Sequence, residues 1–318
     1  MKSFNPVDHK LIFFGTPLFA IPTLEALHRE GYQIKMVITQ PDKPVGRGRI
    51  LTATPLQQKA TALGLPVFQP VVLKSTETAR ILSNSEPALA VIVAYGKIIP
   101  SQILNIPPQG CINLHPSLLP HYRGPSPIQS VILNGETETG VSVMLIDAEM
   151  DHGPLLAQER TPIDPDETSE TLHQKLALLG AQLMVRTVMA YLRSEIVPQK
   201  QDHHHATFCK LINKKDGMIT SNDTSEIIYR KVRALSPWPG VFMPWNGKTI
   251  KLHQVKPASS SLNREEFKDT KNGEFFQNDG HLYLKLKDSS LEIFKLQLEG
   301  KNKLMASDFI HGYLHEKN

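Results

Sequence analysis

The sequence of 318 residues contains no long apolar run. A helix that crosses a membrane needs about 20 consecutive, predominantly apolar residues. Residues 1–9 are polar and have neither the basic-then-apolar profile nor the small-residue cleavage site of a secretion signal. We therefore expect a soluble protein of the cytoplasm with no membrane partner.

Cysteine is scarce as well. Cys111 and Cys209 lie far apart and in no spacing typical of a metal site or a redox pair, which fits a reducing compartment. The triplet His203-His204-His205 is the other potential metal ligand set, but three adjacent residues cannot all reach one ion without further ligands. We expect that triplet to be an exposed patch, and the sequence predicts no bound metal.

The common nucleotide-binding motifs are also missing. The first predicted strand ends at Gly15-Thr16-Pro17, where a dinucleotide-binding domain would carry its glycine fingerprint. Pro17 replaces the glycine that lets the backbone approach a pyrophosphate. No Walker-type loop, Gly-x-x-x-x-Gly-Lys followed by Ser or Thr, occurs, so neither a dehydrogenase nor an ATP-driven enzyme is indicated.

Positive charge, in contrast, is present and unevenly distributed. The net charge is +4; residues 1–206 carry 17 Lys and Arg against 18 Asp and Glu, whereas residues 207–318 carry 18 against 13. A basic second part favours a polyanionic partner.

Short apolar segments alternate with helix-like stretches through about 190 residues, a rhythm typical of a parallel sheet with crossover helices. The predicted strands are Leu11–Phe14, Ile34–Thr39, Leu89–Tyr95, Cys111–Leu114 and Val141–Ile146, and the predicted helices are Leu18–Glu30, Pro55–Leu63 and Thr168–Arg193. Alternating segments with Gly, Asn and Asp turns follow. We predict an α/β protein: a Rossmann-like parallel-sheet domain at 1–193, a linker at 194–207, and a smaller β-barrel domain, OB-like, at 208–318.

Reactive side chains are densest at the end of the predicted strand near residue 114. Asn113 and His115 are two residues apart, so strand alternation places them on one face. Ligands of open α/β sheets bind beyond the carboxyl ends of strands, where this pair falls. Asp151 follows the next apolar segment and would enter the same space if the two strands are neighbours. These three side chains predict either an acid–base site or a hydrogen-bonded turn network.

Several segments carry a family resemblance. They are Phe14–Pro17, Gln40–Pro44, Gly46–Gly48, Ala94–Gly96, Asn113–Pro120 and Asp151–Gly153, with Arg233–Gly240 in the second part. Together, and over almost the whole chain, they resemble the methionyl-tRNA formyltransferase family. The Asn-x-His-x-Ser-Leu-Leu-Pro core occurs in other folate-dependent formyltransferases too, so it indicates the reaction class better than the acceptor.

The resemblance implies roles for individual residues. Asn113, His115 and Asp151 would be catalytic, while the folate site would be formed by Ser117, Leu118, Leu119, Pro120, Tyr95 and Gly96. The co-substrate would be 10-formyltetrahydrofolate, with no metal. An amide donor beside the oxyanion formed by amine attack is typically worth ~3–4 kcal/mol. His115 would stabilise that charge or relay protons, and Asp151 would orient the imidazole or take the amine proton through water.

The acceptor implied by the resemblance is initiator methionyl-tRNA. A monomer is the default expectation. Lys43, Arg47 and Arg49 lie on a Gly-rich loop that the family uses to reach the acceptor end of tRNA, and Arg suits phosphate and unpaired bases. Leu211 stands where the family usually has lysine and Ser221 where it usually has tryptophan. The alternatives are a sister enzyme acting on an amino sugar-nucleotide and a non-enzymatic RNA-binding module.

Overall fold

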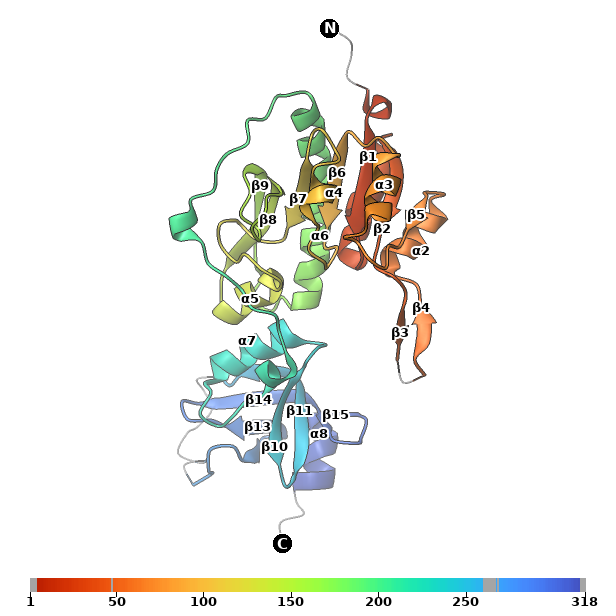
Figure 1. Cartoon of the computed structure of the whole chain (residues 1–318). Helices are drawn as coiled ribbons and strands as arrows, with labels where there is room; N and C mark the ends of the chain where they lie inside the picture. The colour runs from red at the N-terminus through yellow and green to blue at the C-terminus, as the bar shows by residue number, and fades with distance from the viewer. Residues whose placement is uncertain (1–4, 47, 260–266, 268, 315–318) are drawn as a thin grey trace. The chain divides into compact units, whose positions relative to one another are not determined.

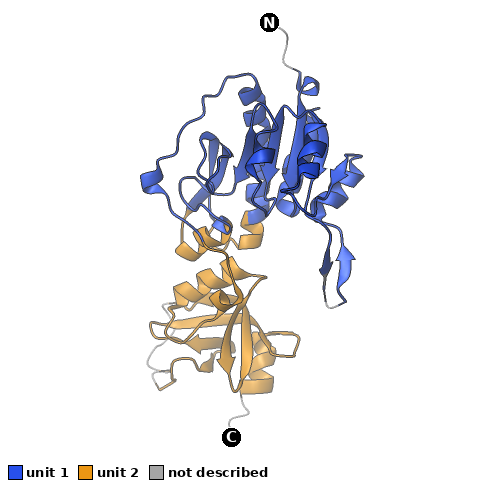
Figure 2. Ribbon diagram, in the orientation of Figure 1, with its two compact units in different colours: residues 1–127, 138–163, 173–209 blue, residues 128–137, 164–172, 210–318 orange. Residues whose placement is uncertain are grey.

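The computed structural model describes residues 5–46, 48–259, 267 and 269–314, which form two compact units (Figures 1 and 2). Unit 1 comprises residues 1–127, 138–163 and 173–209, and unit 2 comprises residues 128–137, 164–172 and 210–318. Two short segments, residues 128–137 and 164–172, thus cluster with the C-terminal residues. No local sequence pattern indicates this grouping.

Unit 1 is built on a seven-stranded sheet with the order β5-β2-β1-β6-β7-β8-β9. Its strands are β1 (Lys10–Gly15), β2 (Gln33–Ile38), β5 (Val67–Phe68), β6 (Leu89–Val93), β7 (Cys111–His115), β8 (Glu138–Leu145) and β9 (Leu155–Pro162). The first five are parallel, which confirms the predicted α/β class, whereas β8 runs antiparallel to both of its neighbours, β7 and β9. The apolar pattern fixes which face of a strand is buried but not its direction, so the antiparallel edge was not predicted.

The helices of this part of the chain are α1 (Ile21–Arg29), α2 (Pro55–Ala62), α3 (Thr76–Ser83), α4 (Ser101–Leu104), α5 (Pro127–Asn134) and α6 (Ser169–Leu192). Pro22 lies in the first turn of α1, where its missing N–H leaves no bond unmade. Thr54 caps α2 by accepting a hydrogen bond from the backbone of Gln57. A small hairpin, β3 (Lys43–Val45) with β4 (Ile50–Thr52), separates β2 from α2.

Helix α6 is the longest of the described helices, and it is the one described helix long and apolar enough to cross a membrane by length and composition. The structure shows a different use for its apolar residues. Leu176, Met184 and Val188 are fully buried, and Gly180 lies against the side chain of Leu114 on β7. The helix thus covers one face of the sheet.

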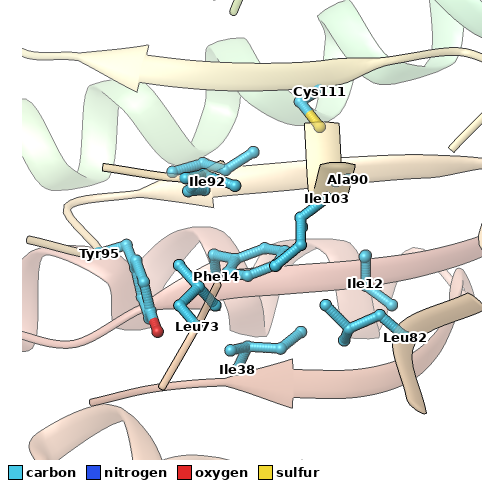
Figure 3. Close-up of a cluster of buried hydrophobic side chains, with 11 residues drawn as sticks. Ile12, Phe14, Ile38, Leu73, Leu82, Ala90, Ile92, Tyr95, Ile103 and Cys111 are labelled. Atoms are coloured by element: carbon cyan, nitrogen blue, oxygen red, sulfur yellow. The ribbon is translucent and has the colours of Figure 1, made fainter. Parts of the chain in front are cut away.

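The opposite face carries a hydrophobic core of side chains from β1, β2, β6, α3 and α4 (Figure 3). Phe14 and Tyr95 meet there edge to face, with ring centroids 5.4 Å apart. Each large apolar side chain buried in this way contributes roughly 1.5–3 kcal/mol. Cys111, the first residue of β7, belongs to this core, and burial raises the pKa of its thiol to about 12.

Unit 2 contains an antiparallel sheet in the order β10-β11-β14-β13-β12, with β15 paired to β14. Its elements are α7 (Ser225–Leu235), β10 (Val241–Trp245), β11 (Lys248–Pro257), β12 (Phe275–Asn278), β13 (His281–Lys285), β14 (Ser290–Leu298), β15 (Lys303–Met305) and α8 (Ala306–Phe309). The structure confirms the predicted β-strands of the second part of the chain and shows that they form an antiparallel sheet. Among the described residues β10 and β12 do not pair, so a closed barrel is not formed by these strands.

Candidate active site at the end of β7

Asn113 and His115 lie on the face of the sheet that carries the core of Figure 3, because they alternate with Leu114, which faces α6. The register of the sheet places Asn113 beside Ile92 of β6. Asn113 is half-buried, and its amide makes no hydrogen bond to any residue that the structure describes. A side chain fixed on a rigid strand with a free N–H group is suited to bind a ligand.

His115 is buried, and both of its ring nitrogens have a neighbour. Nε2 lies 2.9 Å from the carbonyl oxygen of Tyr122, which can only accept, so Nε2 carries the proton. Nδ1 lies 3.6 Å from Oδ1 of Asp151. The other carboxylate oxygen, Oδ2, accepts a hydrogen bond of 2.8 Å from the backbone N–H of Gly124. The structure therefore brings His115 and Asp151 together.

The route by which Asp151 reaches His115 differs from the expected one. Because β8 is antiparallel to β7, its carboxyl end lies beside Ile112, near the start of β7 rather than at the end that carries His115. The loop between β8 and β9 folds back toward His115, and Asp151 adopts a left-handed backbone conformation with φ of +50°. Such conformations are sparsely populated for residues other than glycine and cluster at functional sites.

The turn after His115 is held by internal hydrogen bonds. The buried hydroxyl of Ser117 donates to the carbonyl of His121 at 2.6 Å. Ser142 of β8 donates to the carbonyl of Ser117 and accepts from the N–H of Leu119. Leu118 and Pro120 are half-buried and Leu119 is buried. These bonds fix the backbone of the four residues expected at a folate site.

Tyr95 and Gly96 form a second corner, after β6. The carbonyl oxygen of Tyr95 accepts from the hydroxyl of Thr16 at 2.9 Å and from the amide of Gln40 at 2.8 Å. Gly96 has φ of +78°, which favours glycine, and a Cβ there would lie 2.6 Å from Nε2 of Gln40, so the Gln40 amide would have to move. The Tyr95 hydroxyl is buried without a partner among the described residues, and burial raises the pKa of Tyr95 to about 12.

The residues expected to meet tRNA lie on or next to the hairpin of β3 and β4. The exposed side chain of Lys43 donates from Nζ to Oε1 of Gln40 at 2.8 Å, which links the hairpin to the Tyr95 corner. Arg49 is exposed with φ of +47°. Arg47 lies outside the described residues. Ile50 and Leu51 on β4 are exposed too.

Sequence reasoning missed Gln201 and Arg123, which surround the His115–Asp151 pair. Both side chains are buried, and Arg123 donates to Oε1 of Gln201 through Nε and Nη2. Their signal in the sequence is weak, because residues 194–207 read as a polar linker.

The histidine triplet is exposed, as expected, but His203 has structural contacts. Its ring stacks on His152 with centroids 3.9 Å apart, and its Nδ1 lies 2.9 Å from Nη2 of Arg123. Because Arg123 can only donate, His203 accepts through an unprotonated nitrogen. Desolvation, followed by the nearby charges of His152 and Arg123, lowers the pKa of His203.

His152 itself lies 2.6 Å from Asp147 rather than at His115. Within the described ranges, no three His, Cys, Asp or Glu side chains are grouped to hold a metal.

Comparison with known proteins identifies the family. Residues 9–188 match the formyl transferase family, and residues 211–314 match the formyl transferase C-terminal domain. The chain is 41% identical over 304 residues to a methionyl-tRNA formyltransferase of Koribacter versatilis, covering 95% of both chains. The chain belongs to the methionyl-tRNA formyltransferase family. The matched range of the first domain contains Asn113, His115 and Asp151.

Two solved structures show the same fold at low identity. An N-formyltransferase from Helicobacter canadensis, solved with folinic acid and dTDP-3-aminofucose, has a TM-score of 0.66 and 19% identity, covering 90% of this chain and 98% of that one. HypX from Aquifex aeolicus, solved with tetrahydrofolic acid, has a TM-score of 0.65 and 16% identity; 96% of this chain matches 47% of that chain. At this level of identity, these two likenesses concern the fold alone.

Proposed function

We propose that this chain transfers the formyl group of 10-formyltetrahydrofolate to the α-amino group of initiator methionyl-tRNA. The observation that carries the proposal is the free amide of Asn113 beside the His115–Asp151 pair, in a chain 41% identical to a methionyl-tRNA formyltransferase over nearly its full length. The likeness to an N-formyltransferase solved with an amino sugar-nucleotide concerns the fold alone, so it does not favour a sugar acceptor. The presence of Asn113, His115 and Asp151 together argues against an RNA-binding module without catalysis.

In this reaction the amine nitrogen attacks the formyl carbon, a C–N bond forms, and the carbonyl oxygen becomes an oxyanion. The N–H group of Asn113 donates to that oxygen. A preorganised donor of this kind costs no reorganisation during the reaction and lowers the barrier by roughly 3–4 kcal/mol. Collapse of the tetrahedral species breaks the bond between the formyl carbon and N10 of the folate.

His115 supplies positive charge in this scheme. Its Nε2–H is already used by the Tyr122 carbonyl, so a second proton on Nδ1 makes an imidazolium that faces the carboxylate of Asp151. Asp151 stabilises that cation and, because its side chain is 15% exposed, also accepts the amine proton through water. The same proton is then returned to N10 of the leaving folate, which balances the step.

Binding of the two substrates involves the remaining residues. We assign the folate to the fixed backbone of Ser117, Leu118, Leu119 and Pro120 and to the Tyr95–Gly96 corner. We assign the tRNA acceptor end to Lys43, Arg47 and Arg49, with the basic second unit as a further contact for the polyanion. The protein would act as a monomer in the cytoplasm, without a membrane or a metal.

The acceptor assay tests this proposal. The purified chain is given 10-formyltetrahydrofolate with initiator methionyl-tRNA, uncharged tRNA, free methionine or a dTDP-amino sugar. We expect N-formylmethionyl-tRNA and no comparable product in the other three reactions. Equal turnover of free methionine would refute the tRNA proposal, and turnover of the amino sugar alone would replace it.

A further inference from the structure

We propose that Gln201 is a positioning residue, which holds the loops of Asp151 and Gly124 so that the carboxylate remains aimed at His115. This inference rests on the proposed function and adds to it a residue that lies about 50 positions from Asp151 along the chain. It comes from a segment after α6 that passes β8 and β9, where Gln199 pairs with Leu155 (Figure 1).

All the hydrogen-bonding groups of the Gln201 amide are used. Oε1 accepts from Nε and Nη2 of Arg123 at 3.2 and 2.6 Å. Nε2 donates to the backbone carbonyls of Asp151 at 2.9 Å and Gly153 at 2.8 Å. Because Arg123 only donates and the carbonyls only accept, the orientation of the amide is determined. We call this arrangement the Gln201 bridge.

The Gln201 bridge joins the two backbone segments that hold the His115–Asp151 pair. On one side, Arg123 lies between Tyr122, whose carbonyl accepts from His115, and Gly124, whose N–H donates to Asp151. On the other side lies Asp151 itself. A single amide therefore sets the distance between the carboxylate and both of its neighbours at the site.

Both segments need such support, because their backbones are strained. Asp151 and Tyr122 adopt left-handed conformations with φ of +50° and +59°. Strained residues keep these conformations only where several surrounding contacts hold the backbone in place. Gly124 has φ of +114°, and a Cβ there would lie 2.5 Å from the carbonyl oxygen of Cys209, so this turn cannot shift toward the 207–209 segment.

The bridge is also buried, so water cannot replace it. Gln201 is 5% and Arg123 is 3% exposed, and no carboxylate in the described part of the chain pairs with Arg123. A buried donor or acceptor that loses its partner is costly. Movement of the Asp151 loop would leave several such groups unpaired at once.

The test compares Gln201→Glu with Gln199→Glu. In Gln201→Glu one oxygen still accepts from Arg123, but the other faces two carbonyl oxygens and cannot donate. We expect kcat to fall roughly 10- to 100-fold, as misplacement of a catalytic group by about 1 Å does, while KM for both substrates changes less than about threefold. Gln199 is exposed on the same segment, and we expect Gln199→Glu to keep the wild-type kcat.

Hydrogen exchange of the Gly124 amide gives a readout independent of activity. That N–H is bonded to Asp151, so NMR should show exchange accelerated about tenfold or more in Gln201→Glu and unchanged in Gln199→Glu. If Gln201→Glu does not fold, the uncharged Gln201→Met is measured instead, with the same expectation. A folded variant with wild-type kcat, with a changed KM only, or with unchanged Gly124 exchange overturns the proposal. An inactive wild-type protein would refute the proposed function, whereas Gly124 exchange would still decide the role of Gln201.

Discussion

The loop after β7 and the hairpin of β3 and β4 differ in how their polar groups are held. His115 is 4% exposed, and its neighbours Tyr122, Gly124 and Asp151 are bonded to one another or to buried side chains. On the hairpin, Ile50 is 71% exposed and Arg49 faces solvent. A developing charge needs dipoles that are already in place, whereas an RNA end can be met by side chains that adapt. The predictions below separate these two kinds of site.

The largest effect is expected from His115→Ala, which in the proposed mechanism removes the positive charge that stabilises the oxyanion and which takes the imidazole away from Asp151. We expect kcat to fall by roughly 10³-fold with little change in KM for tRNA. Steady-state formylation of methionyl-tRNA measures it. His121→Ala is the matched control, because His121 is exposed on the same loop. A folded His115→Ala protein with full activity would contradict the assigned role.

Asn113→Ala should lower kcat by roughly 10²-fold, because it removes the N–H group that we propose as the oxyanion donor. Asn113→Asp keeps the shape but replaces that donor with a negative charge, so its kcat should be lower still. The comparison of kcat between the two variants is a sharper test than either value alone. If Asn113→Asp were the more active of the pair, Asn113 would not be the oxyanion donor. Asn105→Ala, at an exposed asparagine after α4, serves as the control.

Gly96→Ala tests the link between the hairpin and the Tyr95–Gly96 corner after β6, since Gln40 binds both the Tyr95 carbonyl and Lys43. A Cβ would press on the Gln40 amide and would strain the backbone, at a cost of roughly 1–3 kcal/mol of stability. Gly64→Ala has a similar φ of +69° and no atom within 4 Å, so it reports backbone strain alone. Urea unfolding of both variants measures the difference. Equal losses of unfolding free energy in the two variants would mean that the Gln40 side chain moves aside without cost.

Arg49→Ala should raise KM for tRNA several-fold and leave kcat for saturating substrate unchanged, the reverse of the result at His115. Loss of one side-chain cation that contacts a phosphate should reduce the slope of log affinity against log salt concentration by about 0.7 to 0.9. Filter binding at several salt concentrations measures that slope. Arg29→Ala, at an exposed residue of α1, should leave it unchanged. A loss of kcat in Arg49→Ala would place the hairpin among the catalytic elements.

The smallest effect is expected at Leu211, which is 71% exposed and stands where the family usually has lysine. Leu211→Lys should tighten tRNA binding by a few-fold. It should also steepen the slope of log affinity against log salt concentration, by at most the amount that one neutralised phosphate adds. Leu211→Gln adds polarity without charge and should not change the salt dependence. Identical slopes for the two variants would show that this position does not meet the RNA.

Much of the fold could be predicted because the signals are local. The strands β1, β2, β6 and β7 and the helices α1, α2 and α6 lie where apolar spacing, caps and turns placed them, within a few residues. Strand β9 and the hairpin of β3 and β4 were not predicted. The two hairpin strands have only three residues each and β4 exposes all of its residues, while the apolar residues of β9 stand together rather than alternating with polar ones. Neither segment therefore has a clear period in the sequence.

The sequence by itself determined that Asn113 and His115 share a face, because alternation along a strand is a property of the backbone. It also determined the family, through motifs spread over most of the chain. Only the tertiary structure decided that β8 is antiparallel, that the Asp151 loop folds back to His115, and that Gln201 and Arg123 hold it there. Those contacts join segments about 30 to 80 residues apart, and their geometry depends on how the whole sheet assembles rather than on any local pattern.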